Sequence, residues 1–531
     1  MSAGYDSFVR DRLPSADRQP EFRFDLPELH YPERLNAATE LLAGGAPGDC
    51  AVLSGAGQRT YRELDALSSR IARLLAEEEG LIPGNRVLLV GRNGAMLIAA
   101  WLGVLKAGGV AVAAMPILRG GEIAKIVRKA EISHAIIDEP CRAACAEAAA
   151  QCPSLRSTLF YDGDEGADEL ARRIAPLSGA FVSADTGRDD PALIAFTSGT
   201  TGEPKGCVHF HRDVLASADS FARHVLAPAR GTRWSCTAPL AFTFGLGMQF
   251  IFPFRFGGTA VVPDKPGPEG LVEAIERHSV EICATAPTAY RAMLGMLEGR
   301  DLGSLRTCVS AGEHLPAATW RAWREATGIG IVDGIGATEM MHIFISASGE
   351  DICPGATGRA VPGYVATVLD DAGAPMAKGT GRLAVKGPTG CRYLADPRQV
   401  DYVIDGWNVT GDTYRLDAEG YFWFVARSDD MIVSAGYNIA GPEVEQALYG
   451  HPAVAECAVV GVPCPERGSK VKAFVVLTSG YAERDELAAE LREHVKAAIA
   501  PYKCPREIAF VESLPKTATG KLRRFELRRG Q

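Results

Sequence analysis

The chain has 531 residues, of which 47% are hydrophobic and 23% are charged, and its formal net charge is −9. At about 100–200 residues per domain this length predicts several packing units, and the composition excludes a largely disordered chain. The negative charge argues against a nucleic-acid-binding surface, which requires a basic face. The 13 cysteines are dispersed without a Cys-x-x-Cys pair, a distribution typical of reduced thiols in a cytoplasmic protein.

The most apolar stretch and the first residues do not match membrane or targeting segments. The opening string MSAGYDSFVRDRLPS lacks the basic-then-apolar order of a signal peptide. The longest apolar stretch, 96–115, is interrupted by Lys106 and a pair of glycines, which favours a buried helix followed by a strand over a membrane span. We therefore expect no membrane segment and a cytoplasmic location.

The first two thirds of the chain alternate between strand and helix patterns. A polar, proline-containing segment over 1–45 runs into a helix that begins near Leu35. From 50 to 190, strand-like runs alternate with helical patterns such as Tyr61–Glu79, and the alternation resumes from 192 to 345. The strand-like runs of the first stretch are 86–91, 110–116 and 134–139. This alternation predicts α/β layers built on a mostly parallel sheet.

The pattern changes in the last third of the chain. Between about 355 and 426, short strands separated by turn residues indicate a β-rich subdomain. Beyond residue 427, the order helix, strand, strand, helix, strand indicates a separate small α+β domain. We therefore predict a large N-terminal domain over 1–426, made of layered α/β subdomains and the β-rich subdomain, and a C-terminal domain over 427–531.

The first motif with chemical content is TSGTTGEPKG, residues 197–206, which follows the apolar run ALIAF. Glycines let the backbone approach a ligand closely, and hydroxyls with successive N–H groups bind phosphate oxygens. Lys205 adds a positive charge. The motif differs from the G-x-x-x-x-G-K-[ST] loop because no serine or threonine follows the lysine directly. It predicts a phosphate site of another kind.

Three further motifs follow in order along the chain. GIGATE, residues 334–339, supplies a hydroxyl at Thr338 and a carboxylate at Glu339 beside a predicted strand end. A carboxylate near a triphosphate can hold Mg²⁺, which accepts few protein carboxylates and several phosphate oxygens. TGD at 410–412, followed by ARSDD, and PKTATGKL at 515–522 complete the series.

Together these strings resemble the signature motifs of the adenylate-forming superfamily, which contains acyl-CoA synthetases, peptide-synthetase adenylation domains and luciferases. The resemblance covers nearly the whole chain. It implies the fold of these enzymes, in which the small C-terminal domain is mobile. It also implies that the protein uses ATP and Mg²⁺ to activate a carboxylic acid as its acyl-adenylate.

The resemblance implies which residues bind ATP and catalyse adenylation. Lys521 matches the C-terminal catalytic lysine, a cation needed where negative charge gathers on the α-phosphate. Lys521, Lys205, Thr338 and Glu339 form the predicted catalytic set, and Glu339 and Thr200 the predicted metal ligands. The predicted ATP- and AMP-binding residues are Thr197, Ser198, Gly199, Thr200, Thr201, Gly202, Lys205, Gly312, Glu313, Asp333, Gly334, Ile335, Gly336, Thr338, Asp412, Arg427 and Lys521.

Two of these positions carry specific implications. Asp412 is expected to accept the ribose hydroxyls with help from Arg427, because an acceptor-only carboxylate suits two hydroxyl donors. Most members of the superfamily have an aromatic residue against adenine where this chain has Ile335, so the expected platform is aliphatic. Ile335 resembles the residue at that place in benzoate-type ligases.

The resemblance also assigns the second half-reaction to the C-terminal domain. Asp429 matches the hinge between the two domains, and SAGYNIAGPEVE, residues 434–445, resembles the loop that lines the pantetheine tunnel. The predicted CoA-binding residues are Gly436, Tyr437 and Lys470. Arg467 and Lys472 are further candidates for a basic cluster that holds the 3′-phosphate of CoA.

The acid pocket is expected between 239–247, 310–313 and 335–342. Most superfamily members carry histidine where this chain has Phe242, and large aromatic side chains in a concave site suit a planar aromatic acid. His342 either bonds an ortho substituent or forms part of the wall. The predicted acid-binding residues are Phe242, Thr243, Phe244, Gly247, Ala311, Gly312, Ile335, Gly336 and His342.

Within the superfamily, the N-terminal string FDLPELHYPERLN, GIGATEMMHIF and the pocket string resemble the benzoate-CoA ligase branch, and 2-aminobenzoate-CoA ligases most. Benzoate, salicylate and other hydroxybenzoates stay open as substrates, because an apolar slot discriminates weakly against one small added group. An aryl-AMP ligase that loads a carrier protein would share every motif. A luciferase-type oxidoreductase shares the adenylation step, whereas a nucleotide sensor would be expected to lack Lys521 or Glu339. We expect a monomer or a homodimer.

Overall fold

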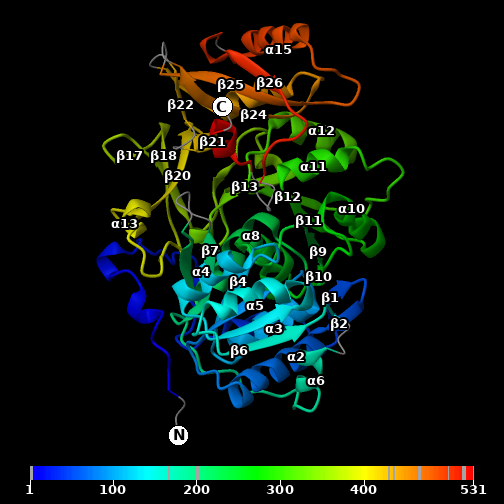
Figure 1. The fold of residues 1–531 in the computed structure, drawn as a ribbon, viewed down its shortest axis with the longest axis vertical. Helices are drawn as coiled ribbons and strands as arrows, with labels where there is room; N and C mark the ends of the chain where they lie inside the picture. Colours follow the sequence, from blue (N-terminus) through cyan, green and yellow to red (C-terminus); the bar gives the residue numbers. More distant parts are fainter. Residues whose placement is uncertain are drawn as a thin grey trace.

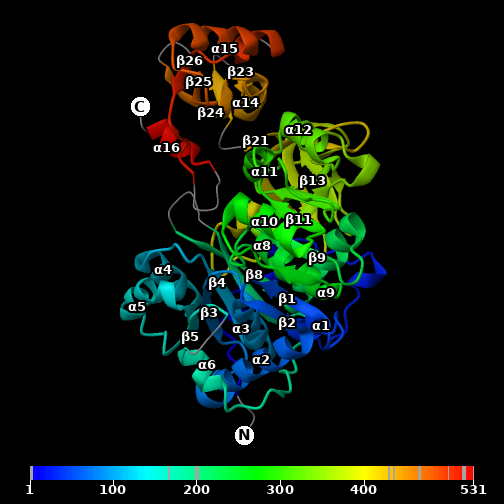
Figure 2. The same cartoon turned by 90° about the vertical axis from the view of Figure 1, so that its right-hand side faces the viewer.

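The computed structural model describes residues 4–164, 168–197, 203–427, 431–434, 437–464, 468–499, 501–516 and 522–529. It consists of a large N-terminal body and a small domain at its top, formed by the C-terminal part of the chain (Figure 1). In the view turned by 90°, the small domain lies above the part of the large body that contains α11 and α12 (Figure 2). This confirms the predicted architecture of a large α/β domain followed by a small α+β domain.

The first sheet of the large domain contains six strands in the order β6-β5-β3-β4-β7-β8. All neighbours are parallel except β7 and β8, which form an antiparallel pair. Its strands are β3 (Arg86–Val90), β4 (Val110–Ala114), β5 (His134–Asp138), β6 (Ser157–Tyr161), β7 (Pro191–Thr197) and β8 (Lys205–Phe210). Its outer helices are α4 (Gly120–Ala130), α5 (Arg142–Ala150) and α6 (Glu169–Ile174). The mostly parallel sheet predicted from the alternation is confirmed.

The second sheet contains nine strands in the order β15-β14-β13-β12-β11-β9-β10-β1-β2. Its strands are β1 (Cys50–Ser54), β2 (Gly57–Thr60), β9 (Arg233–Cys236), β10 (Thr259–Val261), β11 (Ile282–Thr285), β12 (Thr307–Ala311), β13 (Ile331–Gly336), β14 (Ile343–Ser346) and β15 (Arg359–Ala360). Helices α10 (Gly267–His278), α11 (Pro287–Leu294) and α12 (Ala317–Thr327) pack against it around the buried side chains of Tyr290 and Trp323.

A layer of helices joins the two sheets into one core. It comprises α1 (Ala37–Leu42), α2 (Tyr61–Arg73), α3 (Ala95–Lys106), α7 (His211–Ser217), α8 (Thr243–Leu246) and α9 (Phe252–Arg255). The helix expected near Leu35 begins at Ala37, because the Asn36 side chain caps it by accepting a hydrogen bond from the Ala38 N–H. Every residue of α3 is buried, and β4 follows it, as the 96–115 stretch predicts. Within the described ranges, no helix is both long and apolar enough to cross a membrane.

The β-rich subdomain is an antiparallel sheet in the order β17-β16-β18-β20-β19, with β21 paired to β20. Its strands are β16 (Val365–Leu369), β17 (Pro375–Met376), β18 (Gly379–Lys386), β19 (Val403–Ile404), β20 (Trp407–Leu416) and β21 (Phe422–Arg427), and α13 covers Gln399–Tyr402. The β20–β21 register places Asp412 opposite Arg427. The aspartate of TGD and the arginine of ARSDD therefore meet on one hairpin.

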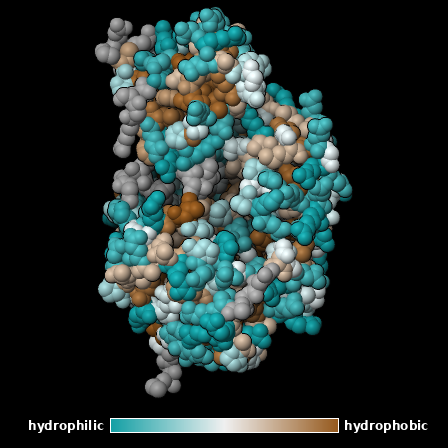
Figure 3. Space-filling view, turned by 45° about the vertical axis from the view of Figure 1, so that its right-hand side comes forward, coloured by the Kyte–Doolittle hydropathy of each residue, from teal (hydrophilic) through white to brown (hydrophobic). Residues whose placement is uncertain are grey.

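The small domain contains the predicted order of helix, strand, strand, helix and strand, preceded by a short hairpin and followed by a further helix. Its elements are β22 (Ile432–Ser434), β23 (Tyr437–Ile439), α14 (Gly441–Tyr449), β24 (Val454–Cys464), β25 (Gly468–Leu477), α15 (Asp485–Ala498), β26 (Glu507–Phe510) and α16 (Arg524–Arg529). Leucines and valines of α14, α15 and the β24-β25-β26 sheet form its own core. On the face seen in Figure 3, most residues are hydrophilic, and hydrophobic residues gather in a patch on the small domain.

Candidate active site

The phosphate-loop motif closes the β7–β8 hairpin. Thr197 ends β7 and pairs with Lys205, which begins β8. Residues 198–202 of the motif, which are Ser198, Gly199, Thr200, Thr201 and Gly202, lie outside the described residues. The Thr197 Oγ1 atom is buried and has no hydrogen-bond partner among the described residues. Such an orphaned hydroxyl beside a glycine-rich loop is available to a polar ligand.

Lys205, the lysine of this motif, lies close to Glu339. Lys205 Nζ lies 4.0 Å from a carboxylate oxygen of Glu339, and the Glu339 residue is 7% exposed. A third residue, Tyr393, joins them: Lys205 Nζ donates to the Tyr393 hydroxyl at 2.9 Å, and that hydroxyl donates to Glu339 Oε1. Burial and the Glu339 carboxylate raise the pKa of Tyr393 far above its usual value, so Tyr393 stays a hydrogen-bond donor. Sequence reasoning missed Tyr393 because it lies outside the four motifs.

The GIGATE segment is tied to the strand that follows the phosphate loop. Thr338 and Glu339 lie on a short 3-10 turn (Thr338–Met340) directly after β13. The fully buried ring of His209, on β8, contacts the Thr338 carbonyl oxygen through Nε2 at 2.7 Å. A hydrogen bond at this distance fixes the backbone of Thr338 relative to Lys205.

The ends of β12 and β13 form a second part of the site. These parallel strands pair Ser310 with Asp333 and Ala311 with Gly334. Gly312 then turns away with φ +93°, a conformation that favours glycine, and Glu313 follows it. Asp333 Oδ1 and Ser310 Oγ are both buried, and neither has a partner at hydrogen-bond geometry in the described part of the chain. Burial raises the pKa of Asp333 to about 7, against smaller opposing effects of the nearby Ser310 hydroxyl and the Gly334 N–H. Two orphaned polar atoms at adjacent strand ends are available to a polar ligand.

Ile335 and Gly336 end β13 and lead toward Thr338. Ile335 is half-buried and packs against the main core, whereas Gly336 is exposed. A Cβ at Gly336 would lie 2.8 Å from the His342 carbonyl oxygen, so the backbones are close at this point. The β13 end therefore connects the nucleotide motif to the segment that carries His342.

Asp412 and Arg427 form the pair that the β20–β21 register predicts. Arg427 Nη1 lies 3.4 Å from Asp412 Oδ1, and the two side chains are 51% and 13% exposed, respectively. The Asp412 N–H is bonded to the Thr410 hydroxyl at 3.3 Å, within the TGD motif itself. The carboxylate thus lies on β20, an interior strand of the β-rich sheet, with its guanidinium partner reaching toward solvent.

The predicted acid slot is built around α8. Phe242 and Phe244 are half-buried, Thr243 is buried, and Gly247 follows the helix directly. A Cβ at Gly247 would lie 2.4 Å from His342 Cδ2, so the glycine admits the imidazole ring. Alanine would collide with it.

His342 lies behind Gly247 in an aromatic cluster. Its ring centroid is 4.5 Å from that of Phe252, 5.5 Å from Phe221 and 5.7 Å from Phe244. Nε2 lies 3.4 Å from the Phe244 carbonyl oxygen, while Nδ1 has no partner among the described residues. Burial lowers the pKa of His342 to about 3, so the ring is neutral near pH 7.

The C-terminal site predictions fall partly outside the described residues. Asp429, Gly436 and Lys521 are not described, and neither is Arg467. Tyr437 begins β23, but its side chain is also outside the description. Lys470 forms an ion pair with Glu507 at 2.8 Å, and Lys472 pairs with the same carboxylate. Two members of the basic cluster predicted for CoA, Lys470 and Lys472, therefore share one carboxylate in this structure.

The small domain rests on the large domain through Arg291 of α11. Its guanidinium donates to the Val454 carbonyl oxygen at 2.9 Å and lies 4.2 Å from the centre of the Tyr449 ring. These contacts join α11 to the α14–β24 region of the small domain. The contacts of Arg291 therefore link the large domain to the small domain.

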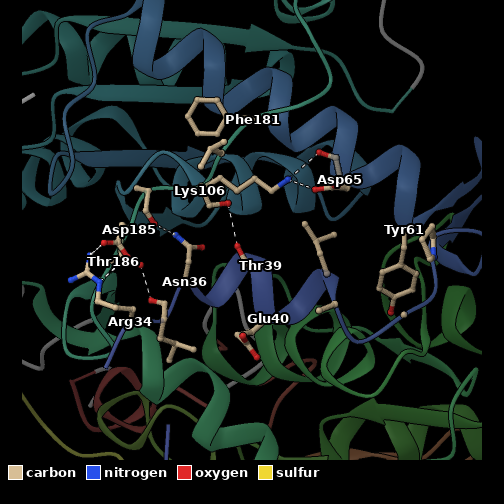
Figure 4. A pocket seen from close by; sticks show the side chains of 18 of the residues that line it. Arg34, Asn36, Thr39, Glu40, Tyr61, Asp65, Lys106, Phe181, Asp185 and Thr186 are labelled. Atoms are coloured by element: carbon tan, nitrogen blue, oxygen red, sulfur yellow. Dashed lines mark hydrogen bonds and ion pairs between the residues drawn. The ribbon is translucent and has the colours of Figure 1, made fainter. Parts of the chain in front are cut away.

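A separate groove of about 910 Å³ lies between α1, α2 and the segment 181–186, at the far end of the large domain from the small one (Figures 1 and 4). Its polar side chains pair with one another: Lys106 with Asp65, and Arg34 with Asp185. It contains none of the four motifs. The groove is therefore not part of the candidate site.

The described residues also limit how a metal ion can bind. Among them, no group of three or more His, Cys, Asp and Glu side chains is arranged to hold a metal. Glu339 supplies a single carboxylate, and its Oε2 accepts no hydrogen bond from a described residue. This fits Mg²⁺, which binds to one or two carboxylates together with phosphate oxygens and water.

Comparisons with known proteins cover both domains. The AMP-binding enzyme model matches residues 41–393, and the AMP-binding enzyme C-terminal domain model matches 443–521. Benzoate–CoA ligase of Thauera aromatica is 37% identical over 513 residues, which cover 94% of this chain and 97% of that protein.

Two solved structures share the fold over nearly the whole chain. The anthranilate CoA ligase AuaEII in complex with anthranoyl-AMP superposes with a TM-score of 0.90 at 34% identity, covering 95% of this chain and 99% of that one. A benzoate CoA ligase from Burkholderia xenovorans LB400 gives 0.85 at 33% identity, with coverages of 93% and 99%. The chain therefore belongs to the AMP-binding enzyme family, the adenylate-forming superfamily of AMP-forming acid–CoA ligases, in its benzoate–CoA ligase branch.

Proposed function

We propose that this protein is a cytoplasmic aryl-CoA ligase that activates a benzoate-type acid, with 2-aminobenzoate as the favoured substrate. The observation that carries the proposal is the short distance between Lys205 and Glu339. Lys205 belongs to the phosphate-loop motif, and Glu339 lies on the segment that leads from β13 to the aromatic slot. The similarity to benzoate and anthranilate ligases supports an aromatic acid. The favoured ortho-amino group rests on that similarity.

The nucleotide site is built from the strand ends. Thr197, Lys205 and the loop 198–202 bind the phosphates, and Asp333 with Gly312 and Glu313 lines the adenine pocket. Ile335 gives the adenine an aliphatic platform, followed by Gly336. The unpartnered Oδ1 of Asp333 is an acceptor for the exocyclic amine of adenine. Asp412, supported by Arg427, accepts the ribose hydroxyls.

Glu339 and Thr200 are the proposed ligands of Mg²⁺, which when bound neutralises charge on the triphosphate. Thr338 lies beside Glu339 and contributes its hydroxyl to the same phosphates. The chain itself contributes orientation, because His209 fixes the Thr338 backbone and Tyr393 fixes the carboxylate. Catalysis of phosphoryl transfer depends mainly on such positioning and on electrostatic stabilisation.

The acid pocket is proposed between α8 and the end of β13. Phe242, Thr243 and Phe244 flank a planar ring, Ala311 and Gly312 lie near the carboxylate, and Gly247 provides the floor. His342 forms the wall behind Gly247, because it is buried among three phenylalanine rings. Because its imidazole is neutral near pH 7, His342 places no charge beside the apolar slot.

The reaction proceeds in two steps. A carboxylate oxygen of the acid attacks the α-phosphorus of ATP, the bond to the β-phosphate oxygen breaks, and pyrophosphate leaves. The thiol of CoA then loses its proton and attacks the acyl carbon, and AMP leaves with the oxygen that came from the acid. Lys521 and Lys205 stabilise the negative charge of the first step.

We propose that the two steps use different arrangements of the domains 1–426 and 427–531. The chain pivots near Asp429, so that Lys521 serves adenylation, and Gly436 and Tyr437 serve the thiol. Lys470 takes part in CoA binding only if it exchanges Glu507 for the 3′-phosphate. Lys521→Ala should slow adenylation by at least 100-fold and leave thioester formation from supplied aryl-AMP within about three-fold. An equal loss in both half-reactions would contradict this division.

The substrate and the acceptor are tested in one assay. Pyrophosphate release is measured for benzoate, 2-aminobenzoate, salicylate, 3-hydroxybenzoate and short fatty acids, with and without CoA. The proposal predicts that aryl acids, with 2-aminobenzoate first, have the highest kcat/KM and that aryl-CoA accumulates. If only fatty acids react, the aromatic slot is wrongly assigned. If aryl-AMP forms but CoA yields no thioester, a carrier protein is the acceptor instead.

A further inference from the structure

Tyr393 stands between the two charged groups of the adenylation site. Its hydroxyl accepts a hydrogen bond from Lys205 Nζ at 2.9 Å and donates one to Glu339 Oε1. The ammonium also lies 4.8 Å from the centre of the Tyr393 ring, a position in which the ring face attracts it. The Tyr393 hydroxyl therefore both accepts and donates a hydrogen bond, and the Tyr393 ring contacts the same ammonium group.

The segment that carries Tyr393 is held rigidly against the phosphate-loop strand. The Val208 N–H donates to the Arg392 carbonyl oxygen at 2.8 Å, and the Leu394 N–H donates to the Gly206 carbonyl oxygen at 2.8 Å. Tyr393 lies opposite Cys207 in an antiparallel bridge. Residues 391–394 thus run beside β8 as a short strand. Any shift of Tyr393 has to break the hydrogen bonds between this strand and β8.

Side chains around this strand fix it further. Gln399 of α13 accepts a hydrogen bond from the Tyr393 N–H at 2.9 Å through its side-chain oxygen. The fully buried guanidinium of Arg392 donates to Asp213 at 2.7 Å and lies between the rings of Phe22 and Phe210, at 4.1 Å and 4.0 Å. These contacts hold the strand against its neighbours, although Nε and Nη2 of Arg392 have no hydrogen-bond partner among the described residues. The Tyr393 hydroxyl is therefore presented at a defined position.

This position keeps the ion pair between Lys205 and Glu339 long, because the Tyr393 hydroxyl lies between the two charged groups. Their charged atoms are 4.0 Å apart, and the Glu339 side chain is almost fully buried, so attraction between them is strong. A closer contact would occupy the Glu339 carboxylate with the Lys205 ammonium group. With the hydroxyl between them, Glu339 Oε2 accepts no hydrogen bond from a described residue and is open to a further ligand.

We propose that Tyr393 is a positioning residue of the adenylation step, which orients Glu339 for the Mg²⁺ of Mg·ATP and holds Lys205 apart from it. The inference rests on the proposed function, because it requires Glu339 to be a metal ligand. Tyr393 acts through these two side chains and touches neither the acid nor the thiol. Its loss should therefore weaken metal binding and slow adenylation, and spare thioester formation.

The matched control is Tyr402, the neighbouring tyrosine. Its ring packs edge-on against that of Tyr393 with centroids 5.9 Å apart, and it is also buried. Its hydroxyl has no hydrogen-bond partner among the described residues. Removing this hydroxyl takes the same atom from the same cluster without touching Lys205 or Glu339.

The test compares Tyr393→Phe with Tyr402→Phe by electron paramagnetic resonance of Mn²⁺ in the presence of a non-hydrolysable ATP analogue. A hydrogen bond to a charged group is expected to be worth at least a ten-fold change in binding, which equals about 1.4 kcal/mol. We expect Tyr393→Phe to raise the Mn²⁺ dissociation constant at least ten-fold. Tyr402→Phe should stay within two-fold of the wild type. ATP–pyrophosphate exchange should require correspondingly more Mg²⁺, while the rate of thioester formation from supplied aryl-AMP stays within two-fold.

A double variant provides a second, independent measurement. Glu339→Gln should weaken Mn²⁺ binding by itself, and adding Tyr393→Phe to it should weaken binding no further, because the tyrosine acts through the carboxylate. Thermal unfolding establishes that each variant is folded. Additive losses in the double variant would mean that Tyr393 acts elsewhere and would overturn the inference.

The remaining outcomes separate this inference from the proposed function. If Tyr393→Phe binds Mn²⁺ as the wild type does, or loses both half-reactions equally, the positioning role is wrong and the ligase function stands. If the wild type forms no complex with Mn²⁺ and the analogue and catalyses no ATP–pyrophosphate exchange, the proposed function fails, and the inference fails with it.

Discussion

Asp412→Asn should separate nucleotide recognition from folding. Asp412 faces Arg427 across the β20–β21 hairpin at 3.4 Å, and the Arg427 side chain is 51% exposed. Because water already solvates this guanidinium, the ion pair contributes about 0–1 kcal/mol to stability. The proposed ribose contact is worth more, since replacing a charged acceptor of two hydroxyls costs about 1.5–3 kcal/mol. This corresponds to a roughly 10- to 100-fold rise in the KM for ATP.

The assay is ATP–pyrophosphate exchange with benzoate at varied ATP, combined with thermal unfolding. Asp417→Asn, at the other end of the same hairpin, is the matched control: its carboxylate accepts from Trp423 Nε1 at 2.7 Å and from the Tyr421 N–H at 2.8 Å. It should lower stability by about 1 kcal/mol and leave the KM for ATP unchanged. The reasoning is refuted if Asp412→Asn changes that KM by less than two-fold, or if it unfolds the protein while Asp417→Asn does not.

Three further predictions concern packing, the domain junction and pH. Gly247→Ala places a Cβ 2.4 Å from His342 Cδ2, so we expect a loss of about 1–3 kcal/mol in thermal unfolding and a higher KM for the aryl acid, with the KM for ATP unchanged. Arg291→Ala removes the bond to the Val454 carbonyl oxygen, so the ratio of the two half-reaction rates should change by about three- to ten-fold; an unchanged ratio would mean that this contact does not bias the domains. Burial raises the pKa of Asp333 from 3.8 to about 7, so between these values the folded state holds more protons than the unfolded state and stability falls as pH rises. Asp333→Asn should therefore gain thermal stability relative to the wild type from about pH 4 to about pH 7 and no more above it, whereas a constant difference would contradict the shift.

The sequence predicted those features that local patterns determine. Strands 86–91, 110–116 and 134–139 were readable because buried parallel strands are continuous apolar runs, and they are confirmed as β3, β4 and β5. The order of elements in the small domain was readable because apolar strand runs alternate with helical periodicity there. Motifs with fixed spacing, such as GIGATE, placed Thr338 and Glu339 next to each other whatever the fold around them.

Contacts between distant parts of the chain were not readable. Tyr393 lies 54 positions from Glu339 and 188 from Lys205, and only the ladder between β8 and residues 391–394 brings the three together. The cluster of Phe221, Phe244 and Phe252 around His342, on which the proposed wall role rests, also brings together distant parts of the chain. The pairing of Lys470 with Glu507 likewise depends on the parallel pairing of β25 and β26.

The most direct test of acid adenylation follows one oxygen atom. A benzoate-type acid that carries ¹⁸O in its carboxylate is incubated with the enzyme, ATP, Mg²⁺ and CoA, and the nucleotide products are analysed by mass spectrometry. Because the acid oxygen attacks the α-phosphorus and leaves with AMP, the account predicts one ¹⁸O in AMP and none in pyrophosphate. Label in inorganic phosphate with formation of ADP, or thioester formation with unlabelled AMP, would contradict an acyl-adenylate intermediate at this site.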